Sequence, residues 1–278
     1  DDIEELTGLS VIDRSSPTQE NGEDTEELSK KHIQTAFDKG TNQFEWKIKN
    51  QKTNKIIDIE VLLSTVEING RLILQSTARE ITERKEMEAK VEKLAYEDDL
   101  TGLANRRTLL ERLTHILNTY KRTNNNGALL FIDLDHFKVI NDTLGHNTGD
   151  KLLQHVANRI QSCIRDGDTV ARFGGDEFVV MLEDLDKSSM PAVSKAESTC
   201  EKLLNDLNKP YEIGGQHILI SASIGVTMFS QNNIATDLLQ QSDIAMYQAK
   251  SCGRNAIRFF DPEMQKAVDD RASTEAEI

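Results

Sequence analysis

The sequence is short of several residue types, and each shortage argues against a class of protein. It has 33 Lys and Arg against 47 Asp and Glu, a net charge of −14. A nucleic-acid-binding surface needs clustered cations, so we expect no nucleic-acid partner. The three cysteines, Cys163, Cys200 and Cys252, are scattered and lack metal-ligand spacing. They are typical of a reducing cytosol rather than of a disulfide framework, so we expect a cytoplasmic protein.

Long apolar runs are also missing. No run approaches the length of a transmembrane helix, and the chain shows no signal peptide. The 278 residues, 37% of them hydrophobic, can form one large or two modest domains. The chain does not begin with Met. We therefore expect a piece of a longer protein, whose membrane anchor could lie upstream.

The most unusual stretch is Arg172 to Phe178, Arg-Phe-Gly-Gly-Asp-Glu-Phe. Short segments rich in β-branched and aromatic residues flank it, as strands do. Gly174 and Gly175 between them predict a tight hairpin turn. Asp176 and Glu177 follow at once, and hairpin chemistry does not explain them. They either hold a cation beside a ligand that the glycines admit, or are solvated acids of an ordinary hairpin.

A second stretch favours the cation. Residues 127–132, Gly-Ala-Leu-Leu-Phe-Ile, predict a buried strand, and Asp133 follows directly. An acid at the end of a buried strand is costly unless it is paired or bound to a metal. Asp133 and Asp135 are two residues apart, so on a strand they share a face. Asp133 could therefore join Asp176 and Glu177 in a carboxylate cluster, and such all-oxygen ligation suits Mg²⁺.

These stretches belong to a series of motifs that resembles the GGDEF family of diguanylate cyclases, which make cyclic di-GMP from two GTP. The resemblance covers residues 96–261, and a chance match of so many motifs in the family's order is implausible. The motifs are Asp99 to Arg107 (DLTGLANRR), Phe131 to Lys138 (FIDLDHFK), Asn141-Asp142, Gly145-His146, Gly149-Asp150, Gly174 to Phe178, Ala249-Lys250 and Gly253 to Asn255.

The element pattern and the resemblance together predict an α+β fold with a catalytic domain at 99–262. We expect helices at 106–122, 150–165, 188–207 and 236–249, a loop at 145–149, the strand ending at Asp133, the signature hairpin, a hairpin of 211–213 with 216–229, and a last strand at 257–260. Thr236 is the expected N-cap of the last helix. This order predicts a mixed, mostly antiparallel sheet covered by helices. It agrees with the family's fold, which resembles the palm of nucleotide cyclases and polymerases.

Residues 1–79 predict a separate unit. After a polar loop at 13–27, the pattern predicts a helix at 26–38 and strands at 43–49, 55–66 and 70–78, with a turn at Asn69-Gly70. Three strands followed by a helix, with Gly8 near the start, resemble the later part of a PAS sensor domain. Another small α/β scaffold is the alternative. The single Trp, Trp46, lies on the apolar strand face, where a core role is commoner than a ligand contact.

Residues 80–98 predict a helical linker. Arg84, Met87, Val91 and Leu94 repeat at a spacing of three and four, which favours a coiled-coil seam between two copies. The alternative is an amphipathic helix packed on its own domain. The tail, 263–278, is rich in Ala and Glu and resembles the lead-in to an EAL phosphodiesterase domain. A parent chain with that domain would both make and break the dinucleotide.

The resemblance implies roles in a reaction in which the 3′-hydroxyl of one GTP attacks the α-phosphorus of another and pyrophosphate leaves. Asp133 and Asp176 would carry Mg²⁺ (or Mn²⁺), with the Leu134 carbonyl as a backbone ligand. Glu177 would be a metal ligand or organise the nucleophile. Asp176 and Glu177 are thus the catalytic candidates, with Asp176 preferred as proton acceptor.

The resemblance also implies a GTP site. Asn141 and Asp150 would bind the Watson–Crick edge of guanine, with His146 nearby or merely in a loop. The other implied GTP-binding residues are Phe137, Lys138, Gly174, Gly175, Lys250 and Arg254. The three cations in that set would hold phosphates, helped by amides of the 135–138 loop, unless they are simply solvated.

Arg165 and Asp168 match the family's Arg-x-x-Asp inhibitory site, where the cyclic di-GMP product binds; a salt-bridged turn is the alternative. The chemistry needs two catalytic domains face to face, so we expect a homodimer through the linker helix and the PAS-like unit. Two other functions stay open. One is a catalytically weak GGDEF module that binds GTP or cyclic di-GMP and regulates an EAL domain. The other is a pure interaction and sensor protein.

Overall fold

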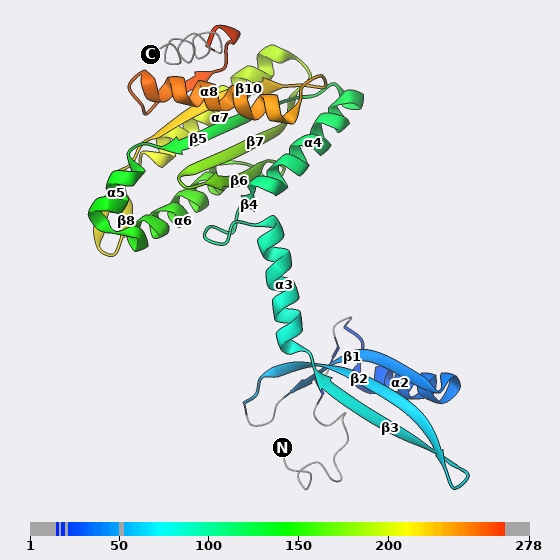
Figure 1. Ribbon diagram of the computed structural model, residues 1–278. Helices are drawn as coiled ribbons and strands as arrows, with labels where there is room; N and C mark the ends of the chain where they lie inside the picture. The colour runs from blue at the N-terminus through cyan, green and yellow to red at the C-terminus, as the bar shows by residue number, and fades with distance from the viewer. Residues whose placement is uncertain (1–14, 17, 20–21, 50–52, 265–278) are drawn as a thin grey trace, which may run out of the picture. The chain divides into compact units, whose positions relative to one another are not determined.

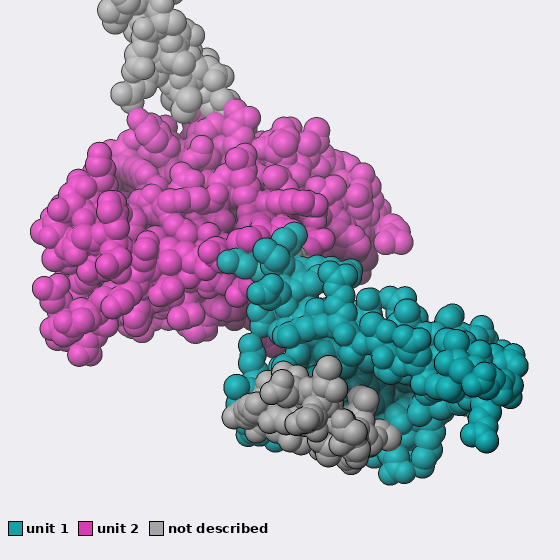
Figure 2. Space-filling view, turned by 60° about the horizontal axis from the view of Figure 1, so that its bottom comes forward, with its two compact units in different colours: residues 1–92 teal, residues 93–278 magenta. Residues whose placement is uncertain are grey.

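The computed structural model describes residues 15–16, 18–19, 22–49 and 53–264. The chain divides into two compact units, residues 1–92 and 93–278 (Figures 1 and 2). The division falls inside helix α3 (Thr82–Tyr96), which lies within the linker expected at 80–98. Gly8 and nearly all of the tail lie outside the described residues. No helix among the described residues has the length and apolar character that crossing a membrane requires.

The first unit is a three-stranded antiparallel sheet with one helix. Its elements are α2 (Thr25–Lys39), β1 (Thr41–Lys49), β2 (Ile56–Ile68) and β3 (Arg71–Glu80), with the strands in the order β1-β2-β3. Asn69 and Gly70 turn from β2 to β3 with positive φ, as a two-residue hairpin loop requires. Trp46 is 3% exposed and packs with Ile59 and Val61, so the expected core role is confirmed.

The second unit is built on a six-stranded sheet of order β11-β10-β5-β7-β6-β4. Its elements are β4 (Ala104–Asn105), α4 (Arg106–Thr123), β5 (Asn126–Leu134), α5 (Phe137–Leu144), α6 (His146–Cys163), β6 (Thr169–Gly174), β7 (Glu177–Asp186), α7 (Ser189–Leu207), β8 (Tyr211–Ile213), β9 (Gln216–Ile218), β10 (Ala222–Phe229), α8 (Ala235–Ser251) and β11 (Ile257–Phe259). The β10–β11 and β4–β6 pairs are parallel and the other pairs of this sheet antiparallel, which confirms the mixed sheet.

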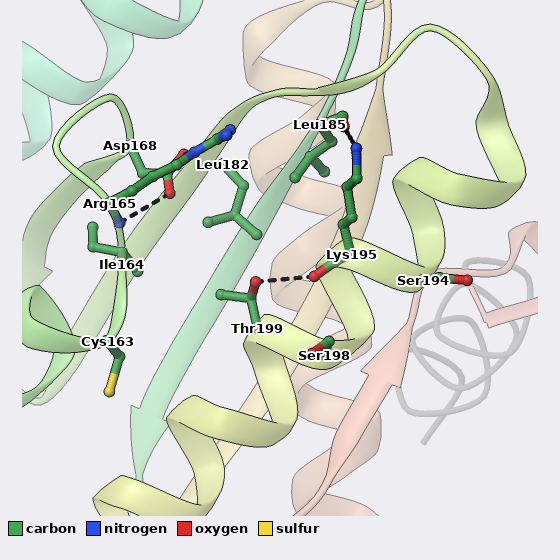
Figure 3. A pocket seen from close by; sticks show the side chains of 10 residues that line it. All are labelled: Cys163, Ile164, Arg165, Asp168, Leu182, Leu185, Ser194, Lys195, Ser198 and Thr199. Atoms are coloured by element: carbon green, nitrogen blue, oxygen red, sulfur yellow. Dashed lines mark hydrogen bonds and ion pairs between the residues drawn. The ribbon is translucent and has the colours of Figure 1, made fainter.

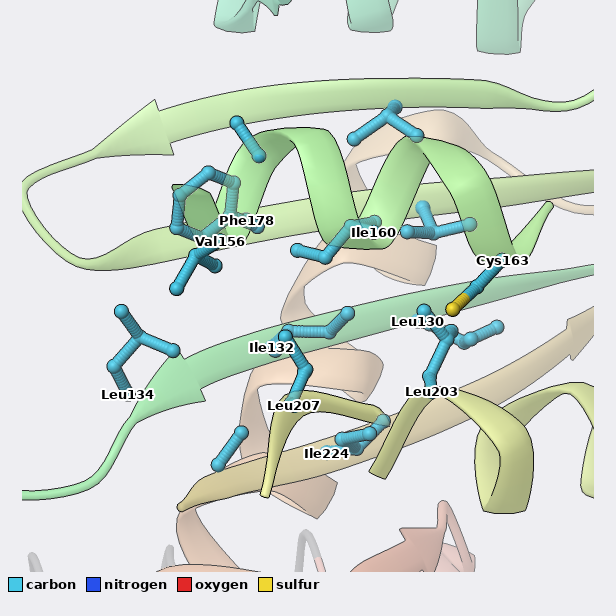
Figure 4. Packing of buried hydrophobic residues seen from close by; sticks show 14 of the residues in the cluster. Leu130, Ile132, Leu134, Val156, Ile160, Cys163, Phe178, Leu203, Leu207 and Ile224 are labelled. Carbon is cyan, nitrogen blue, oxygen red and sulfur yellow. The ribbon is translucent and has the colours of Figure 1, made fainter. Parts of the chain in front are cut away.

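Helices cover both faces of this sheet (Figure 1). Side chains alternate along β5, so each face receives every second residue. Leu130, Ile132 and Leu134 pack with α6 and α7, and Figure 4 shows them beside Val156 and Ile160. Leu129 and Phe131 pack on the other face, with α4 and α8. Asp133 belongs to this second series, so the alternation directs it toward the α8 face.

The structure corrects three expectations about element ends. The expected loop at 145–149 is wrong: α6 begins at His146, and only Gly145 separates it from α5. Gly145 has a φ of 84° and its amide donates to the Asn141 carbonyl, so one glycine makes the whole turn. The expected helix at 150–165 therefore starts four residues earlier and ends at Cys163.

The second correction concerns Thr236. The N-cap of α8 is Ile234, and the Thr236 hydroxyl donates to Asp237 instead of capping the helix. The third concerns residues 216–229, which do not form a single strand. β9 pairs with β8 in a separate two-stranded sheet, and β10 joins the main sheet, with residues 219–221 between them.

Gly225 of β10 lets α8 lie close to the sheet. A Cβ at Gly225 would stand 2.0 Å from the Ser242 carbonyl oxygen and 2.1 Å from the Met246 nitrogen, both backbone atoms of α8. Gly225→Ala should therefore lower the free energy of unfolding by about 2 to 3 kcal/mol, because helix and strand must separate. Urea unfolding measures this. Gly167→Ala is the matched control, since open space surrounds that Cβ; equal losses in both variants would contradict the packing argument.

Candidate active site

The signature stretch forms the expected hairpin between β6 and β7, with Gly175 in the left-handed region at a φ of 51°. Arg172 fixes the turn: its guanidinium donates to the Gly175 carbonyl, at 3.0 and 2.7 Å, and pairs with Asp98 at 3.1 Å. Burial alone would raise the pKa of Asp98, but hydrogen bonds from Thr101 and Arg172 outweigh it and lower that pKa. Sequence reasoning gave Arg172 and Asp98 no role, because their contact spans 74 residues.

Asp133 lies beside this turn. In the antiparallel pair of β5 and β7, Asp133 is directly opposite Glu177. The next amide, that of Leu134, donates to the Asp176 carbonyl at 3.4 Å. The ends of β5 and β7 thus bring together all three acids that the sequence singled out.

Lys250 partly neutralises these acids. Its ammonium lies 2.6 Å from the carboxylate of Asp133, a residue that is only 5% exposed. Burial raises the pKa of Asp133 to about 6; Lys250 opposes the shift, and the charges of Asp176 and Asp135 add to it. Burial and the neighbouring Asp133 and Asp243 likewise raise the pKa of Glu177. The pKa values of Asp133 and Glu177 thus stay raised although Lys250 lowers both, so Lys250 alone does not neutralise this group of acids.

Asp243 is an acid that sequence reasoning missed. It lies on α8 and lines a cavity of about 370 Å³ together with Glu177, Arg106 and Phe173. Burial raises its pKa, which Lys250 lowers in part. Its spacing of seven from Lys250 places both residues on one face of the helix, and that was the available signal.

These acids could provide part of the coordination shell of a hard divalent cation. Among the described residues, no three His, Cys, Asp or Glu side chains form a ready-made metal cage. Mg²⁺, however, is usually held by one or two carboxylates together with waters and substrate phosphates. Asp133 and Asp176, with the Leu134 carbonyl, could supply such a partial set.

The expected guanine-binding residues come from α5 and α6. Asn141 packs so closely on Gly149 that a Cβ there would stand 1.8 Å from Asn141 Oδ1. That oxygen is buried and accepts no hydrogen bond within the described part of the chain. A buried acceptor without a donor costs free energy, so a ligand N–H would be stabilising here. Asp150 and His146 are exposed on α6 near by.

The comparison with known families decides the identity of the second unit. Residues 95–256 match the family model described as diguanylate cyclase, GGDEF domain, which covers more than half of the chain. The chain belongs to the GGDEF family.

Similar proteins agree. The chain is 38% identical over 207 residues to the bifunctional diguanylate cyclase/cyclic di-GMP phosphodiesterase MucR of Pseudomonas aeruginosa, covering 74% of this chain and 28% of that protein. It is 36% identical over 191 residues to the cyclic di-GMP phosphodiesterase NbdA of the same organism, covering 68% and 24%. It thus spans about a quarter of the length of these relatives. The solved GGDEF domain of TpbB (YfiN), also from P. aeruginosa, superposes with a TM-score of 0.59 at 34% identity, over 63% of this chain and 99% of that one.

In this GGDEF domain the other residues expected to bind GTP come from α5, from α8 and from the turn after α8. Phe137 is buried at the start of α5, and Lys138 is exposed in its first turn. Lys250 is already bound to Asp133. Arg254 follows α8 with a φ of 63° and is exposed.

Arg165 and Asp168 do form a salt-bridged turn. Arg165 Nε lies 3.2 Å from Asp168 Oδ1, and the guanidinium also donates to the Glu183 carbonyl. The pair lines one wall of a cavity of about 470 Å³, and Lys195 and Thr199 of α7 line another (Figure 3). Lys195 was not expected from sequence; it donates to the Leu185 carbonyl. The turn and a cavity large enough for a ligand thus occur together.

The raised pKa of Asp133 predicts a pH-dependent cost in stability. The folded pKa, about 6, lies above the unfolded value near 4. The cost is therefore absent below pH 4, grows as the pH rises from about 4 to 6, and is constant at higher pH. Without metal, Asp133→Asn should raise the free energy of unfolding at pH 7.5 by about 2 kcal/mol and leave it nearly unchanged at pH 4.

Urea unfolding in EDTA at the two pH values measures this difference. Asp166→Asn, at an exposed position, is the control. A loss of stability in Asp133→Asn at pH 7.5 would mean that the ion pair with Lys250 dominates instead.

Proposed function

We propose that this chain is a diguanylate cyclase, which condenses two GTP into cyclic di-GMP and two pyrophosphates. The observation that carries the proposal is the position of Asp133: opposite Glu177, beside the Gly-Gly-Asp-Glu-Phe turn, and in contact with Lys250. Acids held next to a turn that is open to a ligand suit phosphoryl-transfer chemistry, because that chemistry depends on positioning and charge.

Asp133, Asp176 and the Leu134 carbonyl would hold the metal. When bound, Mg²⁺ (or Mn²⁺) would neutralise the phosphate charge and favour the deprotonated 3′-hydroxyl. Glu177 lies opposite Asp133 and would share this role or orient the nucleophile. Asp176, in the turn, is the first candidate to accept the proton.

Asn141 and Asp150 would recognise guanine. The orphaned Asn141 oxygen would accept an N–H of the base, and Asp150 the ring N–H and amino group. His146 begins α6 in the same region. Lys138, Lys250 and Arg254 would hold the triphosphate. Gly174 and Gly175, with open space beside them, would admit the nucleotide to the backbone.

A homodimer would bring two such half-sites together. Met87, Val91 and Leu94 on α3 are 70%, 66% and 47% exposed, which supports the expected seam between two linker helices. The first unit would then act as a partial PAS-like sensor that shifts the pairing of the two domains.

A second candidate function follows from the relatives. MucR is named as bifunctional and NbdA as a phosphodiesterase, and the chain spans only a quarter of each. In such a protein this domain could bind GTP or cyclic di-GMP and regulate a phosphodiesterase domain without turnover. The intact signature, with Asp133 and Lys250 in contact, favours the cyclase.

Turnover separates the two functions. Purified protein with GTP and MgCl₂ should form cyclic di-GMP, detected by ion-exchange chromatography. Asp176→Asn should reduce the rate by at least about a hundredfold, since even residues behind metal ligands contribute 10- to 100-fold. Asp166→Asn should not change it. Binding of GTP with no product from the unaltered protein would support the regulatory module instead.

Product inhibition tests the Arg165 cavity. Added cyclic di-GMP should slow the reaction, and Arg165→Ala should raise its inhibition constant at least about tenfold, because one charge-assisted contact is lost. The initial rate without product should stay the same. Unchanged inhibition in Arg165→Ala would leave this residue as part of a structural turn only.

A further inference from the structure

We propose that Asp135 is a positioning residue that locks the loop after β5 and the loop after α8 into one rigid platform for the triphosphate. The functional part of this inference rests on the proposed GTP chemistry. Its geometric part rests on hydrogen bonds alone and can be tested without a nucleotide.

Asp135 is almost fully buried and satisfied by neutral donors. Its side chain accepts from the hydroxyls of Ser221, at 2.6 Å, and Ser223, at 2.8 Å, and from the Asn255 amide at 3.0 Å. Its own amide donates to the Ser221 carbonyl at 2.8 Å. Asp135 is 4% exposed. Within the described residues, one carboxylate thus joins its own loop to two segments that lie 86 to 120 positions further along the chain.

The two loops that it joins carry the proposed phosphate contacts. Asp135 precedes His136 and Lys138 at the start of α5, and Asn255 directly follows Arg254. His136, Arg254 and Asn255 have φ values of 61°, 63° and 45°. Such left-handed residues with side chains cost about 1 kcal/mol each and persist only where surrounding contacts impose them. The bond from the Asn255 amide to Asp135 is a contact that can impose this conformation.

Asparagine cannot fully replace this carboxylate. The serine hydroxyls can turn and accept a hydrogen bond, but the Asn255 amide can only donate. An Asn side chain has one acceptor oxygen, so it could serve Asn255 but would give up the second carboxylate oxygen. The negative charge also raises the pKa of Asp133 near by, so it adds to the repulsion in the site. We therefore expect graded effects, with Ala worse than Asn.

The geometric part is tested by hydrogen exchange of the metal-free, nucleotide-free protein. In Asp135→Ala, amides in 134–139 and 252–258 should exchange about tenfold faster, because their local opening becomes easier. Arg159→Ala is the matched control: Arg159 donates to the carbonyls of Asp206, Lys209 and Pro210, none of them in the two loops. Unchanged exchange of both loops in Asp135→Ala would overturn the proposal.

The functional part is tested by a double-mutant cycle on binding of the α,β-methylene analogue of GTP with Mg²⁺. Asp135→Ala should raise Kd about tenfold, the effect of one lost charge-assisted contact, and Arg254→Ala similarly. If Asp135 acts through the Arg254 loop, the two effects should not add. The Kd of the double variant should then be at most about twofold higher than that of the weaker-binding single variant. Fully additive effects would contradict the lock, as would an equal loss of binding in Arg159→Ala.

Failure of the two ideas can be told apart. If the unaltered protein does not bind the analogue, the proposed function fails, while loop exchange still decides whether Asp135 locks the loops. If Asp135→Ala does not fold, Asp135→Asn and Ser223→Ala allow the same comparisons with smaller effects. If both loops of those variants exchanged as slowly as in the unaltered protein, the result would contradict the proposal.

Discussion

The second unit depends on one constraint, the negative charge that Asp133 carries where water has little access. Asp133 stands at the end of the central strand β5, and strand alternation directs it to the face that α8 covers. The cation that pairs with it, Lys250, comes from the last turn of α8. Because Gly225 has no side chain, the backbone of α8 packs directly against the backbone of β10. The position of the Lys250 ammonium therefore depends on the glycine at position 225, and so does the charge balance of the site.

Periodicity and turn chemistry predicted the elements of this domain well. The expected helices at 106–122, 188–207 and 236–249 are present within two residues at each end. The Gly174-Gly175 hairpin and the buried strand before Asp133 are present too. These features depend on neighbours in the chain, which a sequence displays directly. Even the meeting of Asp133 with the signature turn follows from two adjacent strands whose acids stand at the same end.

Features that depend on distant contacts could not be predicted in this way. Residues 145–149, Gly-His-Asn-Thr-Gly, have the composition of a loop, yet four of them, from His146 on, form the first turn of α6, where Gly149 fits against Asn141 of α5. Arg172 contacts Asp98, and Lys195 lines a cavity with Arg165. These segments are far apart in the chain, so no local pattern in the sequence indicates that they meet. Thr236 has the right residue type for an N-cap, but α8 starts at Ala235, so the hydroxyl falls inside the first turn.

The groups proposed to bind the nucleotide carry a cost in folding free energy when no ligand is bound. Asp133 and Glu177 have raised pKa values because burial and their neighbours disfavour the charged forms. Asn141 Oδ1 is buried and accepts no hydrogen bond from the residues that the structure describes, and Arg254 and Asn255 hold unfavourable φ values. A ligand that brings a divalent cation, phosphates and an N–H donor would relieve several of these costs at once. Because a ligand stabilises whatever binds it, such a site couples occupancy to folding stability. The buried and half-buried acids, the Asn141 oxygen and the left-handed loop residues are therefore better understood together, as features that the proposed ligand would stabilise, than as separate defects of the fold.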